Sequence, residues 1–118
     1  MAKTKNRAAK KKLVPPVHEI PIKVVNRRTI LLGAKGEKYA MAAWRGSTVT
    51  WMCDYPFAVM FELGSDLMAV KKAKVWELVI PKRPQHFMYK YTIAVCINHD
   101  YILILDPVLV PIPPENCR

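Results

Sequence analysis

The stretch GSTVTWMCDYPFAVMF, residues 46–61, contains two short apolar runs on either side of a polar turn, CDYP. Val49 and Trp51 alternate with threonines, and FAVMF is rich in apolar and aromatic residues, both of which are typical of β-strands. Pro56 has no amide donor, so it fits a turn better than the inside of a sheet. The stretch therefore predicts two β-strands that meet at residues 53–56.

The same pattern extends over the rest of the chain from residue 17. Turn signals such as KGEK, WRGS, LGSD, PKRPQ and NHD separate the apolar segments. Many short strands with regular turns are typical of a sandwich or a small barrel. We predict an all-β fold, a single antiparallel β-sandwich of seven or eight strands. The predicted strands are VHEIPIKVV, TILLGA, KYAMAAW, TVTWMC, FAVMFEL, KVWELVI, FMYKYTIAVCI and YILILDPVLVPI.

Residues 66–79, DLMAVKKAKVWELV, allow two interpretations. Leu67, Val70, Val75 and Leu78 have spacings that one face of a helix could use, and Asp66 could cap that helix. Residues 75–80, however, have the composition of a strand. The segment is therefore either a short helix across the end of the sandwich or a turn followed by a strand.

Length and composition predict one compact domain, residues 17–118, after a basic arm, residues 1–16. A chain of 118 residues with 52% hydrophobic content can bury one core. We expect no membrane span, because no apolar run reaches about eighteen residues. No apolar region follows the basic N-terminus, so we expect a cytoplasmic protein. Ten prolines should lie at edges and turns, and YILILDPVLV could form a homodimer through a sheet edge.

The charge of the chain is concentrated in the arm. Six of the net ten positive charges lie between residues 3 and 12, where there is no acid. Such a segment could be a solvated flexible extension, a phosphate-binding arm for anionic nucleic acid, or a weak attraction to membrane surfaces. The phosphate-binding candidates are Lys3, Lys5, Arg7, Lys10, Lys11 and Lys12.

The three cysteines and three tryptophans have structural interpretations. Cys53, Cys96 and Cys117 form no CxxC pair, which favours free thiols. We expect Cys53 and Cys96 to be small buried residues of the core. All three tryptophans lie on predicted strands, and we expect Trp51 to be at the centre of the core.

Three groups of residues carry a likeness to a known family: Gly46, Val49 and Trp51; Pro56, Phe57, Val59 and Phe61; Tyr91, Cys96 and His99. This arrangement resembles the cupredoxin family of β-sandwich copper proteins. The resemblance implies a cupredoxin-like Greek key, for which an immunoglobulin-like one is the alternative.

The resemblance also implies a copper site built from two His, one Cys and an axial Met. Phe57 stands where the first His would be, and no Met follows His99. Cys96 and His99 are thus weak metal candidates, and we expect neither a metal nor a cofactor.

The sequence motifs favour protein binding over nucleic-acid binding, copper binding and enzyme activity. The chain has no Gly-rich phosphate loop, no GxSxG and no HExxH, so we expect no enzyme activity. An exposed aromatic patch would favour a small non-enzymatic interaction module that binds another protein. Nucleic-acid binding through the arm is the alternative, and copper binding comes third. The predicted interaction patch is Tyr55, Pro56, Phe57 and Tyr101.

Overall fold

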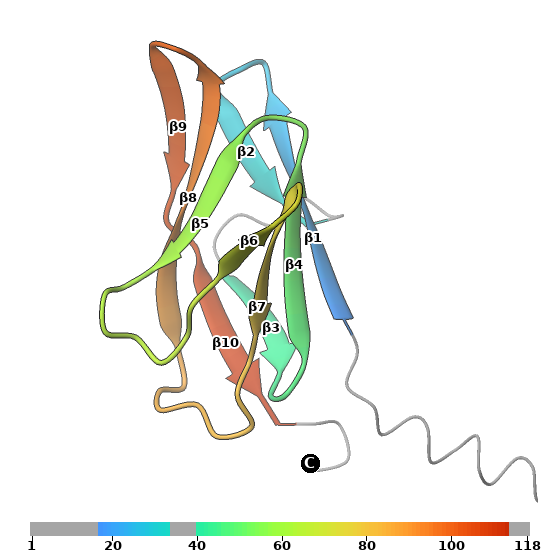
Figure 1. Cartoon of the computed structure of the whole chain (residues 1–118), viewed down its shortest axis with the longest axis vertical. Coiled ribbons are helices and arrows are strands. Elements are labelled where there is room, and N and C mark those ends of the chain that lie inside the picture. Colours follow the sequence, from blue (N-terminus) through green and yellow to red (C-terminus); the bar gives the residue numbers. More distant parts are fainter. Residues whose placement is uncertain (1–16, 34–39, 114–118) are drawn as a thin grey trace, which may run out of the picture.

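The computed structural model describes residues 17–33 and 40–113, and in this part of the chain every regular element is a strand. The predicted arm, residues 1–16, lies outside the described residues. No helix within the described ranges is long and apolar enough to cross a membrane. Figure 1 shows the strands β1 (Val17–Val25), β2 (Thr29–Leu32), β3 (Ala40–Trp44), β4 (Thr48–Cys53), β5 (Phe57–Phe61), β6 (Val70–Lys72), β7 (Val75–Val79), β8 (Tyr89–Asn98), β9 (Tyr101–Leu105) and β10 (Val108–Ile112).

The strands form two mixed sheets, which confirms the all-β prediction. The first sheet has the order β2-β1-β4-β7-β6. The second has the order β3-β10-β8-β5, and β9 also pairs with β8. The prediction of purely antiparallel pairing was wrong for two pairs, because β1 runs parallel to β4 and β10 runs parallel to β3. Between β1 and β4 the chain passes through β3 in the other sheet, and this detour allows the two strands to run in the same direction.

Ten strands are present in the described residues, whereas seven or eight were predicted. One reason is that the predicted strand YILILDPVLVPI forms two separate strands, β9 and β10. Pro107 interrupts YILILDPVLVPI, since it cannot donate to a ladder. The part before it, β9, pairs with β8 at Ile93–Asn98, whereas β10 pairs with β8 at Tyr89 and Lys90. The strands on either side of Pro107 therefore pair with different parts of the same strand, β8.

The helical interpretation of residues 66–79 was wrong, and this segment supplies the other additional strand. Val70–Lys72 pairs antiparallel with Val75–Glu77, so the segment is a tight β-hairpin. Ala73 at its turn has φ of 55°, in the left-handed region that a continuing right-handed helix excludes. Cross-strand pairing thus prevails over the helical spacing of the apolar residues.

One aromatic core joins the two sheets. Trp51 on β4 is fully buried, which confirms its predicted place in the core. Its ring lies edge-on to Tyr91 on β8, with a centroid distance of 5.5 Å, and Tyr91 stacks on Phe61 at 4.9 Å. Trp76 Nε1 on β7 also donates a hydrogen bond of 2.8 Å to the Phe57 carbonyl on β5. The two sheets therefore enclose a single core.

Candidate interaction face

The outward surface of β5, β8 and β9 carries a continuous set of apolar side chains, which we call the apolar face. Directly paired residues in antiparallel strands point to the same side of a sheet. Ile104 pairs with Ala94, and Ala94 pairs with Ala58, which gives one apolar row across the three strands. Ile102 pairs with Cys96 in the next row. The apolar face consists of Ala58, Met60, Ala94, Cys96, Ile102 and Ile104.

The apolar face is exposed and uncharged. Ile104 is 64% exposed, Ile102 is 58% exposed and Met60 is 47% exposed. The alanines at the centre are small, so the isoleucines and the methionine rise at the sides of a shallow surface. At one end the face stops at Thr92, whose hydroxyl donates a hydrogen bond of 2.8 Å to Asp106. Polar groups therefore mark the limit of the surface.

Strand alternation explains why β8 and β9 are apolar on both sides. On β8, Tyr91, Ile93 and Val95 point into the core and are buried, so Ala94 and Cys96 between them point outward. On β9, Leu103 and Leu105 pack against the core. The residues between them, Ile102 and Ile104, consequently face outward. A strand that is apolar at every position is typical of a sheet covered on both faces.

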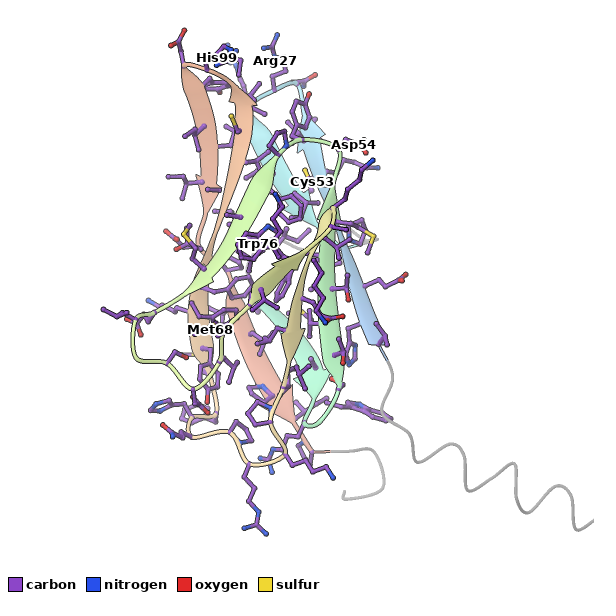
Figure 2. All side chains as sticks on the ribbon, in the orientation of Figure 1. Arg27, Cys53, Asp54, Met68, Trp76 and His99 are labelled. Atoms are coloured by element: carbon purple, nitrogen blue, oxygen red, sulfur yellow. The ribbon has the colours of Figure 1, made fainter. Side chains whose placement is uncertain are left out.

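The turn between β8 and β9 fixes the register of the apolar face. The Asp100 amide donates a hydrogen bond of 2.9 Å to the Asn98 side chain, and the pairing shifts between Cys96 and Asn98. Figure 2 shows His99 at the tip of this turn, at the same end of the molecule as Asp54 in the β4–β5 connection. A local polar turn therefore decides which residues of β9 face solvent.

The residues of the predicted interaction patch lie close to this region and have different environments. Tyr55 and Phe57 are half-buried and pack against the core. Pro56 is exposed, and its carbonyl accepts a hydrogen bond from the Cys96 amide at 2.8 Å. Tyr101 is 38% exposed at the start of β9. Phe57 and Tyr101 are separated by β8, so the four residues do not form one row.

The weak metal candidates are not brought together with the position that the resemblance assigns to the first ligand. Phe57 is on the inner side of the second sheet, whereas Cys96 is on its outer side. The Cys96 thiol donates to the Asn98 carbonyl at 3.4 Å, and His99 is exposed. Within residues 17–33 and 40–113 there is no group of three or more His, Cys, Asp or Glu side chains that could hold a metal ion.

The prediction that Cys53 and Cys96 are both core residues was wrong for Cys96. Cys96 is half-buried and belongs to the apolar face, because Val95 and Ile97 on either side of it point inward. Cys53 packs against the core, and burial raises the pKa of its thiol. Both thiols are free.

A polar network ties together two loops at the opposite end from His99. The Tyr89 hydroxyl donates to Asp66 at 2.8 Å, and the Gln85 amide donates to the same carboxylate at 3.0 Å. Burial alone would raise the pKa of Asp66, but these hydrogen bonds lower it below its ordinary value. Burial and the bond to Asp66 raise the pKa of Tyr89. The network positions loops that carry further exposed apolar side chains: Leu63, Met68, Phe87 and Met88.

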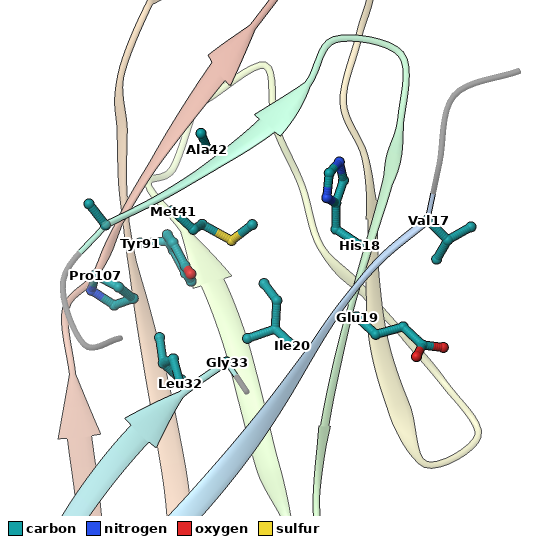
Figure 3. A pocket seen from close by; sticks show the side chains of 11 residues that line it. Val17, His18, Glu19, Ile20, Leu32, Gly33, Met41, Ala42, Tyr91 and Pro107 are labelled. Carbon is teal, nitrogen blue, oxygen red and sulfur yellow. The ribbon is translucent and has the colours of Figure 1, made fainter. Parts of the chain in front are cut away.

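A cavity of about 520 Å³ lies between the two sheets, and sequence reasoning gave no signal for it. Figure 3 shows His18 and Ile20 of β1 on one side and Met41 and Tyr91 on the other. His18 Nε2 accepts a hydrogen bond of 3.4 Å from the Trp44 amide, and burial lowers the pKa of His18. Burial raises the pKa of Tyr91 to about 12, and the indole N–H of Trp51, which approaches the hydroxyl without ordinary hydrogen-bond geometry, opposes part of this rise.

Comparison with known proteins gives no assignment. No protein-family model matches the chain, and no curated protein matches it. The phosphate-binding candidates of the arm lie outside the described residues. The function proposed below therefore rests on the sequence and the described geometry.

Proposed function

We propose that this chain is a small non-enzymatic interaction module that binds another protein through the apolar face. The observation that carries the proposal is the exposure of Ile102 and Ile104 on an uncharged surface formed by three paired strands. Scattered exposed apolar residues are normal, whereas contiguous ones mark contact sites.

The energetics favour a partner that covers this surface. Burying an exposed isoleucine side chain fully stabilises a complex by about 1.5–3 kcal/mol, so two isoleucines and a methionine could provide the centre of an interface. The strands hold these side chains in fixed register, so little ordering is needed on binding. The charged residues at the margin would then contribute to the rim of the contact.

We assign the fold to a cupredoxin-like Greek key that holds no metal. The three groups of residues that resemble that family support this, as does the arrangement of two mixed sheets around Trp51. In this assignment Phe57 replaces a ligand with an apolar side chain that packs against the core. The sandwich then serves as a rigid support for the apolar face.

The test is a matched pair of variants with equally exposed β-branched residues. One is the double variant Ile102→Ser/Ile104→Ser, and the control is Val79→Ser on the outer side of the first sheet. Val79 is 63% exposed and Ile104 is 64% exposed, so both changes should leave the free energy of unfolding within about 0.5 kcal/mol. Sedimentation velocity over a concentration series first shows whether a second copy is the partner, as a sheet-edge homodimer would require.

Affinity capture from an extract of the source organism then compares the two variants with the unmodified chain. We expect a partner, or self-association, that the Val79→Ser chain retains and the double variant loses by about thirtyfold or more, since central contacts contribute at least about 2 kcal/mol. Equal retention by the double variant would contradict the proposal.

Nucleic-acid binding through the arm is the second candidate. The observation that favours it is the concentration of six of the net ten positive charges in residues 3–12. Lysine and arginine side chains that neutralise phosphates gain affinity by counterion release. The salt dependence of this binding is a direct test.

A further inference from the structure

We propose that the cavity between the sheets binds a small apolar molecule that carries a hydrogen-bond-accepting oxygen, such as a carbonyl. This site is separate from the apolar face. It lies on the inner side of the second sheet, whereas the apolar face lies on its outer side. The inference therefore stands independently of the proposed protein partner.

The size and walls of the cavity suit such a ligand. Protein interiors contain few voids larger than a water molecule, whereas sites for small molecules have volumes of about 300–1,000 Å³. The volume here is about 520 Å³. The walls include the apolar side chains of Ile20, Leu32 and Met41, and Pro107 closes one side. An apolar body of the size of a substituted benzene would fill part of this space.

Two buried hydrogen-bonding groups have no partner, and one of them, the Tyr91 hydroxyl, belongs to a residue that lines the cavity. The Tyr91 hydroxyl and the Trp51 Nε1–H are both buried, and neither makes a hydrogen bond of ordinary geometry, although the two approach each other. Tyr91 is only 3% exposed and Trp51 is fully buried, so solvent does not satisfy them. A buried polar group without a partner costs about 1–3 kcal/mol, and such groups are rare in folded proteins. Trp51 does not line the cavity, but its ring lies edge-on to Tyr91 at 5.5 Å, so a ligand that accepts from the Tyr91 hydroxyl would supply the missing partner next to the indole.

The chemistry of these groups selects an acceptor. An indole N–H can only donate, and a tyrosine hydroxyl can donate when it is turned toward an acceptor. Because His18 Nε2 accepts the Trp44 amide, the neutral imidazole carries its proton on Nδ1, which adds a donor on the opposite side of the cavity from Tyr91. A carbonyl oxygen, with two lone pairs, complements these donors. Glu19 also lines the cavity and is an acceptor, so two neutral probes are needed to isolate the contribution of the donors.

A ligand reaches Tyr91 from the side of Met41. Figure 3 shows the Met41 side chain and the Tyr91 ring on the same wall, with the hydroxyl directed toward the space between Ile20 and Leu32. The oxygen is covered in the structure, so its neighbours must move slightly when a ligand binds. Met41 is half-buried and unbranched, and such side chains change rotamer easily.

The probes are acetophenone and ethylbenzene, which have nearly the same shape and differ in the carbonyl oxygen. Titration of the ¹⁵N-labelled full chain, followed by NMR, reports the affinity of each and the indole N–H signal of every tryptophan. We expect acetophenone to bind about five- to tenfold more tightly, which is the gain from one hydrogen bond. The Trp51 indole signal should shift, while that of Trp76, which already donates to Phe57, should not.

Two tyrosines of β8 provide a matched pair of variants. Tyr91→Phe keeps the ring and removes the hydroxyl beside the cavity, so the preference for acetophenone over ethylbenzene should disappear. Tyr89→Phe removes a hydroxyl that donates to Asp66 away from the cavity, so the preference should remain. The amide spectrum of each variant verifies the fold. Met41→Trp, which fills the cavity, should reduce the binding of both probes.

Four outcomes would overturn the inference. One is equal affinity for acetophenone and ethylbenzene in the unmodified chain. The second is an unchanged preference in folded Tyr91→Phe. The third is the absence of binding up to the solubility of the probes. The fourth is a set of signal shifts confined to Ala94, Cys96 and their neighbours, which would place the ligand on the apolar face.

Discussion

The outer faces of the two sheets differ in a way that strand alternation alone does not explain. On the first sheet, Glu19, Thr50 and Glu77 lie in one row, and Lys72 forms an ion pair of 2.7 Å with Glu77. On the second sheet, the corresponding outward positions of β8 and β9 carry Ala94, Cys96, Ile102 and Ile104. Both sheets bury their other side against the same core. The first outer face is therefore polar, whereas the second is the apolar surface that we propose for a partner.

The spacing of apolar residues on the two faces sharpens this difference. The first sheet also exposes valines, Val17 at 60% and Val79 at 63%, but Thr48 lies between them in the ladder. On the second sheet, Ile104 is followed directly by Ala94 and Ala58. Contiguity, and not the exposure of any one residue, distinguishes a contact surface from an ordinary one.

The largest expected effect concerns the binding of DNA through the basic arm, residues 1–16. In the full chain, changing Lys3, Lys5, Arg7, Lys10, Lys11 and Lys12 to Gln should abolish most binding to duplex DNA. Six neutralised phosphates give a slope of log affinity against log salt of about −5, or about 10³ in affinity between 50 and 200 mM salt. Fluorescence anisotropy with a labelled duplex at several salt concentrations measures this slope.

The control for this prediction lies on the first sheet. Changing Lys71, Lys72 and Lys74 to Gln removes three exposed positive charges from the β6–β7 hairpin at the edge of the first sheet. If the arm carries the contact, this variant keeps a slope close to that of the unmodified chain. If the salt dependence is instead lost in the hairpin variant and retained in the arm variant, the nucleic-acid site is on the β6–β7 hairpin and the prediction is wrong.

The next prediction concerns Tyr91, which is buried on the inner side of β8, the strand that carries Ala94 and Cys96 of the apolar face on its outer side. Burial raises the pKa of Tyr91 to about 12, so the folded state favours the neutral phenol. The stabilisation is complete below pH 10, the ordinary pKa, and is lost as the pH rises from 10 to about 12. The free energy of unfolding should fall by about 2–3 kcal/mol over this range. Urea unfolding at a series of pH values measures it.

Tyr91→Phe should remove this part of the alkaline destabilisation. At pH 7 it should unfold at an equal or higher urea concentration, because it removes a buried hydroxyl without a partner. Tyr101→Phe, at an exposed position of the same hairpin, should keep the profile of the unmodified chain. An unchanged profile in Tyr91→Phe would mean that water reaches the inner side of β8.

Much of the fold follows from local sequence signals. Alternation and turn residues predicted the strands around Trp51, and a fully buried Trp51 follows from its alternation with Thr48 and Thr50. Partners distant in sequence were not predictable, because a strand does not encode whether its neighbour runs parallel or antiparallel. The parallel pairing of β1 with β4 depends on the path of the chain through the other sheet. The β6–β7 hairpin depends similarly on pairing that propensity does not show.

The candidate site was harder to predict because it depends on which face each side chain takes. Cys96 was expected in the core, yet a single step along β8 from Val95 places it outside. The signal that could have found the apolar face is YILIL, which has no polar residue at the positions that alternate with Leu103 and Leu105. Patterns in one strand can indicate such a surface, but the contiguity with Ala58 requires the register of β5 and β8.

The smallest effect concerns the ion pair on the polar face. Lys72 and Glu77 have side chains that are 63% and 25% exposed, so water screens their attraction. A double-mutant cycle with Lys72→Met and Glu77→Gln should give a coupling of about 0.5 kcal/mol or less, and 1 M salt should reduce it. Urea unfolding of the four proteins measures the coupling. A value above about 1.5 kcal/mol that salt does not change would mean that this face is also shielded from water, and the difference between the two outer faces would no longer hold.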